Sequence, residues 1–291
     1  MKRILVIGAM GMLGRDLVRM LRSSKGVNSR EGLEVVGWDI DEIDIRQEGT
    51  TQAKIEQLRP DLVINLAAYT DVDGCEANRE EAFRVNAKGM KHVALGAKAC
   101  GAKVAYLSTD YVFDGRKREP YLESDSPNPL NVYGQTKLEG ERYLQEQVED
   151  YLIIRTQWLY GRYGRNFVSS ILRQAKERKT LTIVDDQTGS PTYTVDLSRA
   201  ILTLIDRNSR GIYHVANRDA CTWYTFGQAI LELSQVEGVS IVPISSSALG
   251  RPAVRPPYSV LNTQKLEQET GMSLRHWSEA LKEYLGEVNF K

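Results

Sequence analysis

The first 22 residues constrain the fold more than any other part of the sequence. Residues 3–7 (RILVI) form a short, apolar and largely β-branched run, which is typical of a parallel strand buried on both faces. Gly8, Gly11 and Gly14 follow at once and frame a turn into an amphipathic helix that we expect to end near residue 22. A strand, a glycine turn and a helix in this order predict the first unit of a doubly wound α/β fold.

The glycine spacing also predicts what the turn binds. The first two glycines would let the backbone approach a pyrophosphate, and the third would let helix and strand pack closely. The helix N-terminus would add N–H donors and a positive dipole. A purely structural turn is the alternative, and a P-loop is disfavoured because no Gly-Lys-Ser/Thr follows. The expected dinucleotide contacts in this turn are Gly8, Met10, Gly11, Met12, Leu13 and Gly14.

An acidic residue follows the next apolar run. A polar loop at 23–32 leads to an expected strand at 33–38 (LEVVGW), and Asp39 comes directly after that strand. A dinucleotide fold binds the adenosine ribose hydroxyls with an acid at this place. Asp41 and Asp44 are alternatives, and a solvated acidic turn would explain all three. The expected cofactor contacts here are Asp39, Asp44 and Ile45.

Strands and helices continue to alternate along the first half of the chain. Further buried strands are expected at 61–68, 103–108 and 151–156, with a helical stretch at about 75–100. This alternation predicts a parallel sheet, and such sheets bind ligands at the carboxyl ends of their strands. Small residues at one such end would let a cofactor pass close to the backbone. The residues expected there are Leu66, Ala67 and Ala68.

A tyrosine and a lysine four residues apart predict acid–base chemistry. Tyr133 and Lys137 lie in the sequence NVYGQTKLEGE, and on a helix this spacing places both on one face. An ammonium group near the phenol would favour its ionised form, so that the tyrosine could exchange a proton. A solvated surface pair is the common alternative. Thr109, at the carboxyl end of an expected strand, is a candidate partner for the tyrosine.

The alternation loosens after residue 156. Helices are plausible at 166–177, 195–207 and 223–235, whereas the three prolines in 251–257 exclude a regular helix there. We therefore expect residues 1–156 to form mainly a dinucleotide-binding domain of Rossmann type. Residues 157–291 would form a smaller substrate-binding lobe, with strands that return to the sheet.

Composition limits the kinds of partner. Lysine plus arginine equals aspartate plus glutamate, at 38 each, so no overall charge attracts the protein to nucleic acid or an anionic membrane. Three scattered cysteines and three scattered histidines indicate neither a disulfide framework nor a metal site. No apolar run reaches the ~20 residues that span a bilayer. We expect a cytoplasmic protein with a small-molecule substrate.

These motifs together resemble the extended short-chain dehydrogenase/reductase superfamily and, within it, the dTDP-4-dehydrorhamnose reductase family. The resemblance runs nearly end to end. The turn GAMGMLG and the segment PLNVYGQTK are superfamily features. More specific to the reductase branch are STDYVFDG (108–115), DDQTGSP (185–191) and RPPYSVL (255–261).

The resemblance implies an enzyme that uses NADPH or NADH to reduce the C4 keto group of a dTDP-sugar. Thr109, Tyr133 and Lys137 match the catalytic trio of the family. Some relatives bind magnesium between subunits through acidic residues, but only Asp16 lies near such a position, so a metal is not predicted. A homodimer is possible. The implied substrate contacts are Val72, Tyr111, Trp158, Asn166, Gln187 and Arg255.

Several alternatives remain open from the sequence. Trp158 could belong to the core, and Arg255 could form a surface ion pair instead of binding a diphosphate. A sibling enzyme, either another nucleotide-sugar 4-ketoreductase or an epimerase, would keep the same trio. A non-catalytic regulatory subunit on the same fold would bind the cofactor without turnover.

Overall fold

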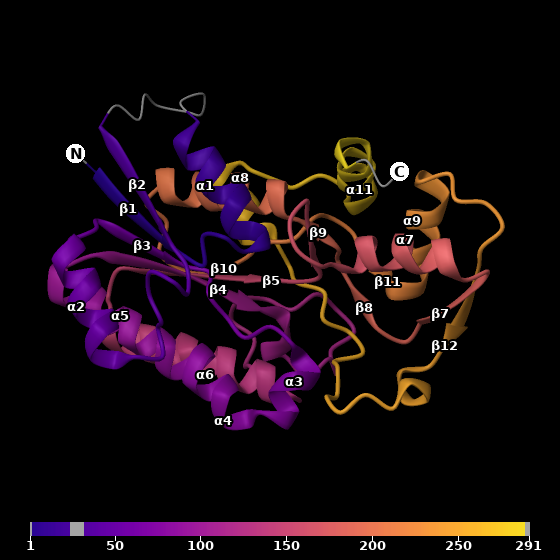
Figure 1. Cartoon of the computed structure of the whole chain (residues 1–291), viewed down its shortest axis with the longest axis horizontal. Coiled ribbons are helices and arrows are strands. Elements are labelled where there is room, and N and C mark those ends of the chain that lie inside the picture. Colours follow the sequence, from indigo (N-terminus) through magenta and orange to yellow (C-terminus); the bar gives the residue numbers. More distant parts are fainter. Residues whose placement is uncertain (1, 24–31, 289–291) are drawn as a thin grey trace.

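A parallel sheet of six strands forms the centre of the computed structural model, which describes residues 2–23 and 32–288 (Figure 1). The predicted polar loop at 23–32 falls almost wholly outside these residues. The strand order is β10-β5-β4-β3-β1-β2, and every neighbouring pair is parallel. The predicted doubly wound α/β fold is therefore confirmed. The strands are β1 (Lys2–Ile7), β2 (Leu33–Trp38), β3 (Leu62–Asn65), β4 (Lys103–Thr109), β5 (Tyr151–Thr156) and β10 (Gly211–His214).

Helices cover both faces of this sheet (Figure 1). Successive strand residues point to opposite faces, so Ile4 and Val6 of β1 pack in one core and Leu5 and Ile7 in another. The first core includes residues of α1 (Met12–Arg22) and α8 (Thr194–Asp206). The second includes residues of α2 (Glu48–Leu58), α5 (Gly89–Cys100) and α6 (Val132–Gln147).

Two predicted elements differ from the observed ones. The strand expected at 61–68 ends at Asn65, because the Asn65 side chain accepts a hydrogen bond from the Ala67 N–H and turns the chain. The helical stretch expected at 75–100 is interrupted. It consists of α3 (Val72–Ala77), α4 (Arg79–Ala82), a π-helix at Phe83–Lys88 and α5.

Most of the elements after β5 form a C-terminal lobe with its own core. The predicted helices are confirmed within two residues at each end as α7 (Phe167–Glu177), α8 and α9 (Trp223–Leu233), and 251–257 is irregular as predicted. Segment 194–214 returns from the lobe to the sheet as α8 and β10. The other elements are the strands β6 (Leu159–Tyr160), β7 (Thr180–Val184), β8 (Thr188–Gly189), β9 (Thr192–Tyr193), β11 (Cys221–Thr222) and β12 (Ser240–Ile244), the helices α10 (Gln264–Thr270) and α11 (Trp277–Glu287), and short 3-10 helices at Asp110–Val112 and Ser246–Leu249.

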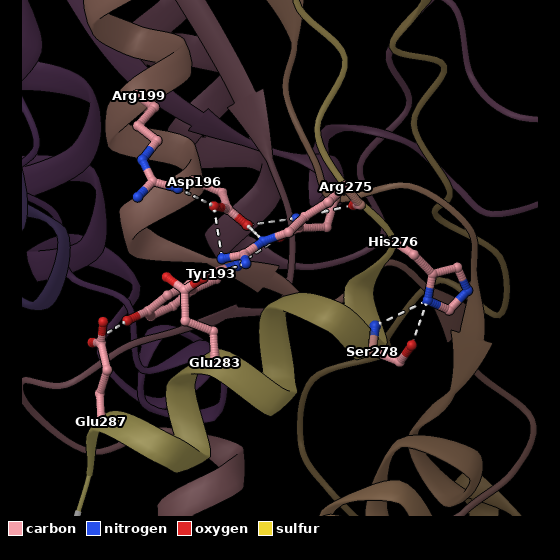
Figure 2. A network of polar contacts seen from close by, with 9 residues as sticks. Tyr193, Asp196, Arg199, Arg275, His276, Ser278, Glu283 and Glu287 are labelled. Atoms are coloured by element: carbon pink, nitrogen blue, oxygen red, sulfur yellow. Dashed lines mark hydrogen bonds and ion pairs between the residues drawn. The ribbon is translucent and has the colours of Figure 1, made fainter. Parts of the chain in front are cut away.

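A polar network fixes the last helix to the sheet domain (Figure 2). Arg275 donates two hydrogen bonds to the Asp196 carboxylate of α8, at 2.8 and 3.0 Å, and pairs with Glu283 of α11. Tyr193 donates to Glu287, near the end of α11, at 2.8 Å. Because Asp196 is only 4% exposed, its charge is compensated inside the protein by this arginine.

None of the helices in the described residues is both long enough and apolar enough to cross a bilayer.

Candidate active site

A cavity of about 1000 Å³ opens at the carboxyl ends of the central strands and extends to the lobe. Its wall includes the glycine turn after β1, the chain after β3, the end of β4, the face of α6 and the chain after β5. Most of the predicted site residues line it. They are Gly8, Met10, Gly11, Met12, Leu13, Gly14, Asp39, Asp44, Ile45, Leu66, Ala67, Ala68, Val72, Thr109, Tyr111, Tyr133, Lys137 and Trp158.

The glycine turn is tight enough to require its glycines. Gly8 has φ +81°, and a Cβ there would lie 2.8 Å from the Ala67 nitrogen. A Cβ on Gly14 would lie 2.1 Å from the Gly8 carbonyl oxygen, so the start of α1 packs directly on the turn. Gly11 caps α1 without any side-chain acceptor. The first N–H groups of the helix are thus suited to an anionic ligand such as a pyrophosphate.

Two acids next to this turn have different surroundings. Asp39 accepts hydrogen bonds from the N–H groups of Met10 at 2.8 Å and Ile40 at 2.9 Å, so its carboxylate is held against the turn. Asp44 accepts two hydrogen bonds from the Arg46 guanidinium and one from the Arg46 N–H, and these contacts lower the pKa of its carboxyl group. Arg46 also lines the cavity and was not predicted from the sequence.

Tyr133 and Lys137 lie on the first two turns of α6, as the spacing predicted. The helix begins after Asn131, whose side chain accepts a hydrogen bond from the Gly134 N–H at 2.8 Å. A Cβ on Gly134 would lie 2.1 Å from the Tyr111 carbonyl oxygen. This glycine therefore lets α6 approach the segment that follows Thr109, the last residue of β4.

The surroundings of this pair raise one pKa and lower the other. Burial raises the pKa of Tyr133, the charge of Asp110 adds to this effect, and a hydrogen bond with Thr109 opposes it. Burial lowers the pKa of Lys137 to about 7. The Lys137 ammonium lies 4.0 Å from the centroid of the Tyr106 ring. Burial thus outweighs the lowering of the Tyr133 pKa that the sequence suggested.

A buried ion pair joins α6 to the sheet. Glu141, one turn beyond Lys137, accepts hydrogen bonds from Arg155 of β5 at 3.0 and 2.7 Å and another from Ser108 of β4. Both charged side chains are at most 2% exposed. The helix that carries the tyrosine is therefore fixed to the two strands whose ends form the floor of the cavity.

Asp110 is a site residue that the sequence did not single out. It is 2% exposed and lines the cavity, and its carboxylate accepts a hydrogen bond from the Thr109 hydroxyl at 3.0 Å. Burial raises the pKa of this carboxyl group to about 7. In the sequence, only the position of Asp110 directly after Thr109 could have indicated a role in the site. The burial of its carboxyl group depends on the complete fold.

On the lobe side of the cavity, Trp158 stacks on Trp223. Their ring centroids are 3.6 Å apart and the rings are within 10° of parallel. Trp158 has φ 47°, so the chain kinks immediately after β5, and the ring covers Gly189. It lines the cavity and also packs against the lobe core, so the core alternative holds in part and the substrate contact stays a prediction.

Three predicted substrate residues do not line the cavity and instead bind protein groups. Asn166 caps α7 and donates to the Gly161 carbonyl at 2.8 Å. Gln187 donates to the Ser246 hydroxyl at 2.7 Å. Arg255 pairs with Asp73 at 2.7 Å.

The family model described as "RmlD substrate binding domain" matches residues 1–290. The chain belongs to this family.

Individual proteins agree with the family assignment. The chain is similar to the spore coat polysaccharide biosynthesis protein SpsK of Bacillus subtilis, with 40% identity over 99% of this chain and 98% of the relative. It is also similar to the crystal structure of a dTDP-4-dehydrorhamnose reductase from Clostridium acetobutylicum, with 40% identity, a TM-score of 0.93 and 98% of each chain covered. A dTDP-4-dehydrorhamnose reductase from Bacillus anthracis, in complex with NADP, matches with 37% identity, a TM-score of 0.93, and 99% and 100% coverage.

The possible metal position of this RmlD-family chain is occupied by protein contacts. Asp16 is fully buried, and its carboxylate accepts hydrogen bonds from the Thr194 hydroxyl at 2.7 Å and from Arg19 at 3.1 Å. Across residues 2–23 and 32–288, no group of three or more histidine, cysteine, aspartate or glutamate residues could hold a metal ion.

Proposed function

We propose that the protein reduces the C4 keto group of dTDP-4-dehydro-β-L-rhamnose to dTDP-β-L-rhamnose with NADPH or NADH. One observation carries this proposal: the same cavity is lined by the glycine turn and by Thr109, Tyr133 and Lys137. Full-length relatives named dTDP-4-dehydrorhamnose reductase support the same substrate.

The residues of the glycine turn fit a dinucleotide. Their N–H groups and the start of α1 would hold the pyrophosphate, Asp39 would lie beside the adenosine ribose, and Leu66 to Ala68 would lie along the cofactor. A bound nicotinamide cofactor would supply the hydride.

The proton for the reduction would come from Tyr133. Its raised pKa keeps the phenol protonated at neutral pH, so that it is ready to donate to the oxygen at C4. Thr109 would donate a hydrogen bond to the same oxygen as negative charge develops there. Lys137 would hold the ribose next to the nicotinamide and, when protonated, favour the phenolate that remains on Tyr133.

The substrate would lie between these groups and the lobe. Val72, Tyr111 and Trp158 line the cavity and are our proposed contacts for the nucleotide-sugar. Asn166, Gln187 and Arg255 stay predictions, because the partners described above already engage their polar groups. A cytoplasmic location and a homodimeric assembly are also part of this proposal.

Product analysis tests the proposal. The purified protein is incubated with dTDP-4-dehydro-β-L-rhamnose and NADPH, and the nucleotide-sugar is identified by mass spectrometry and NMR. We expect dTDP-β-L-rhamnose. A different C4 epimer would indicate a sibling ketoreductase. Binding of cofactor without turnover of any keto-sugar would indicate a regulatory subunit.

A further inference from the structure

Several buried polar atoms without a hydrogen-bond partner gather at one place in the cavity. Among the described residues, Asp110 Oδ2, Thr156 Oγ1, Gln157 Oε1 and Gln157 Nε2 are buried and make no hydrogen bond. All three residues line the cavity. An unpaired buried polar group destabilises the folded state, so folded proteins rarely keep several together unless a ligand or water supplies the missing hydrogen bonds.

Gln157 is the most unusual member of this group. Its side chain is 2% exposed, and neither Oε1 nor Nε2 of its amide has a hydrogen-bond partner in the part of the chain that the structure describes. The neighbouring Trp158 has a left-handed backbone and a ring stacked on Trp223, which fixes the chain immediately after Gln157. The amide is therefore held in a constrained segment and has no hydrogen-bond partner among residues 2–23 and 32–288.

The strand register places Gln157 next to the end of β4 that carries Thr109. Thr156 of β5 is the register partner of Thr109 of β4, and Gln157 follows Thr156 directly. The glycine turn, where the phosphates of a dinucleotide would bind, follows β1, which is separated from β5 by β3 and β4. Gln157 thus lies near the proposed ketone site and on the side of the lobe.

The chemistry of a primary amide restricts its partner. The amide offers donors on Nε2 and an acceptor on Oε1, so a phosphate, which only accepts, would leave Oε1 unpaired. A sugar hydroxyl both donates and accepts hydrogen bonds, so it could pair with the Gln157 amide. The base of a nucleotide-sugar could also do so, but a diphosphate separates it from the sugar.

We infer that Gln157 binds the C3 hydroxyl of the hexose, next to the keto carbon, and is a specificity-determining residue of the site. This inference rests on the proposed function. A site built to hydrogen-bond a hydroxyl rejects an analogue that lacks it, because the buried amide is then left unpaired.

The test compares wild type with Gln157→Met, which has a side chain of similar length without hydrogen-bonding groups. The kcat/KM is measured with NADPH and either dTDP-4-dehydro-β-L-rhamnose or its 3-deoxy analogue. We expect wild type to prefer the parent sugar by on the order of 10- to 100-fold. Gln157→Met should lose this preference and use the parent sugar about as poorly as wild type uses the analogue.

Two further measurements separate this role from others. The Kd for NADPH, from fluorescence titration, should not change in Gln157→Met, and the thermal midpoint should not fall, since an unpaired buried amide has been removed. Gln145→Met, the same change on the exposed face of α6, is the matched control and should resemble wild type. Gln157→Leu replaces the methionine variant if that variant does not fold.

Three outcomes would overturn the inference. A retained preference for the parent sugar would show that Gln157 does not bind the C3 hydroxyl. A weaker NADPH complex with unchanged sugar preference would assign the amide to the carboxamide of the cofactor. A lower thermal midpoint with a general loss of activity would make the residue structural. If wild type reduces neither sugar, the proposed function itself fails.

Discussion

Asp39 shows how one carboxylate can serve both the fold and ligand choice. It accepts a hydrogen bond from the Met10 N–H and so holds the glycine turn, and it also lines the cavity where the adenosine ribose would bind. A carboxylate there can accept hydrogen bonds from a ribose 2′-hydroxyl, and it would repel a 2′-phosphate. Like charges a few ångströms apart near a protein surface can cost on the order of a few kcal/mol.

Asp39→Asn tests this double role. Asparagine keeps an oxygen that can accept from the Met10 N–H, so the turn should remain, whereas the negative charge is lost. We expect wild type to use both cofactors and the variant to shift its kcat/KM ratio towards NADPH. Steady-state kinetics with NADH and NADPH on both proteins measures the shift. An unaltered ratio would show that Asp39 does not face the ribose.

Asp110 predicts a pH dependence of stability. Burial raises the pKa of this carboxyl group from 3.8 to about 7, so the folded protein keeps a proton that the unfolded chain releases. Its contribution to stability is therefore fully present below pH ~4 and is lost as the pH rises towards 7. The slope for one proton is at most about 1.4 kcal/mol per pH unit.

Asp110→Asn removes this titration. We expect the free energy of unfolding of the variant, relative to wild type, to increase between pH 5 and 7 and to level off above pH 7. Urea unfolding at pH 5, 6, 7 and 8 measures the difference. His214, whose pKa burial lowers to about 3, is present in both proteins and cancels. A difference that does not vary with pH would show that Asp110 is already ionised at pH 5.

Among the helices, α6 is held in position by a buried ion pair. Glu141 and Arg155 join the helix to β5, and Ser108 adds β4. Removing one partner of such a pair leaves an uncompensated buried charge, which costs about 3–5 kcal/mol. Replacing both partners by apolar residues often restores stability.

We therefore expect Glu141→Gln to lower the free energy of unfolding by about 3–5 kcal/mol. The double variant Glu141→Leu/Arg155→Leu should regain most of this loss. Glu139→Gln, which breaks the exposed pair with Arg142 on the same helix, is the control and should cost less than about 1 kcal/mol. Urea denaturation measures all three. A Glu141→Gln variant as stable as its control would show that the buried pair does not hold α6.

The elements also differ in how well the sequence predicted them. β1, α1 and α9 carry local signals, namely a β-branched run, a glycine turn and an amphipathic period, and all were predicted. The β7–β12 pair joins residues 180–184 to 240–244 and depends on contacts distant in sequence. The π-helix arises where Asn86 bonds to Tyr69 and Thr136, which no local pattern specifies.

At the scale of the whole molecule, the candidate site forms only where sheet and lobe meet. The glycine turn, Thr109 and Tyr133 come from the sheet domain, and Trp223 of the lobe completes the cavity by stacking on Trp158. The sequence could predict residues that belong to motifs. It could not predict Asp110, Gln157 or Trp223, because their importance depends on burial and on contacts made across the fold.

The turnover number of Tyr133→Phe shows whether the ketone reduction depends on the Tyr133 phenol. The rate is measured with dTDP-4-dehydro-β-L-rhamnose and NADPH, and the Kd for NADPH is measured on the same protein. We expect the turnover number to fall by ~10²-fold or more, the scale of a lost general acid, while cofactor binding is preserved. A Tyr133→Phe variant that turns over at nearly the wild-type rate would contradict it.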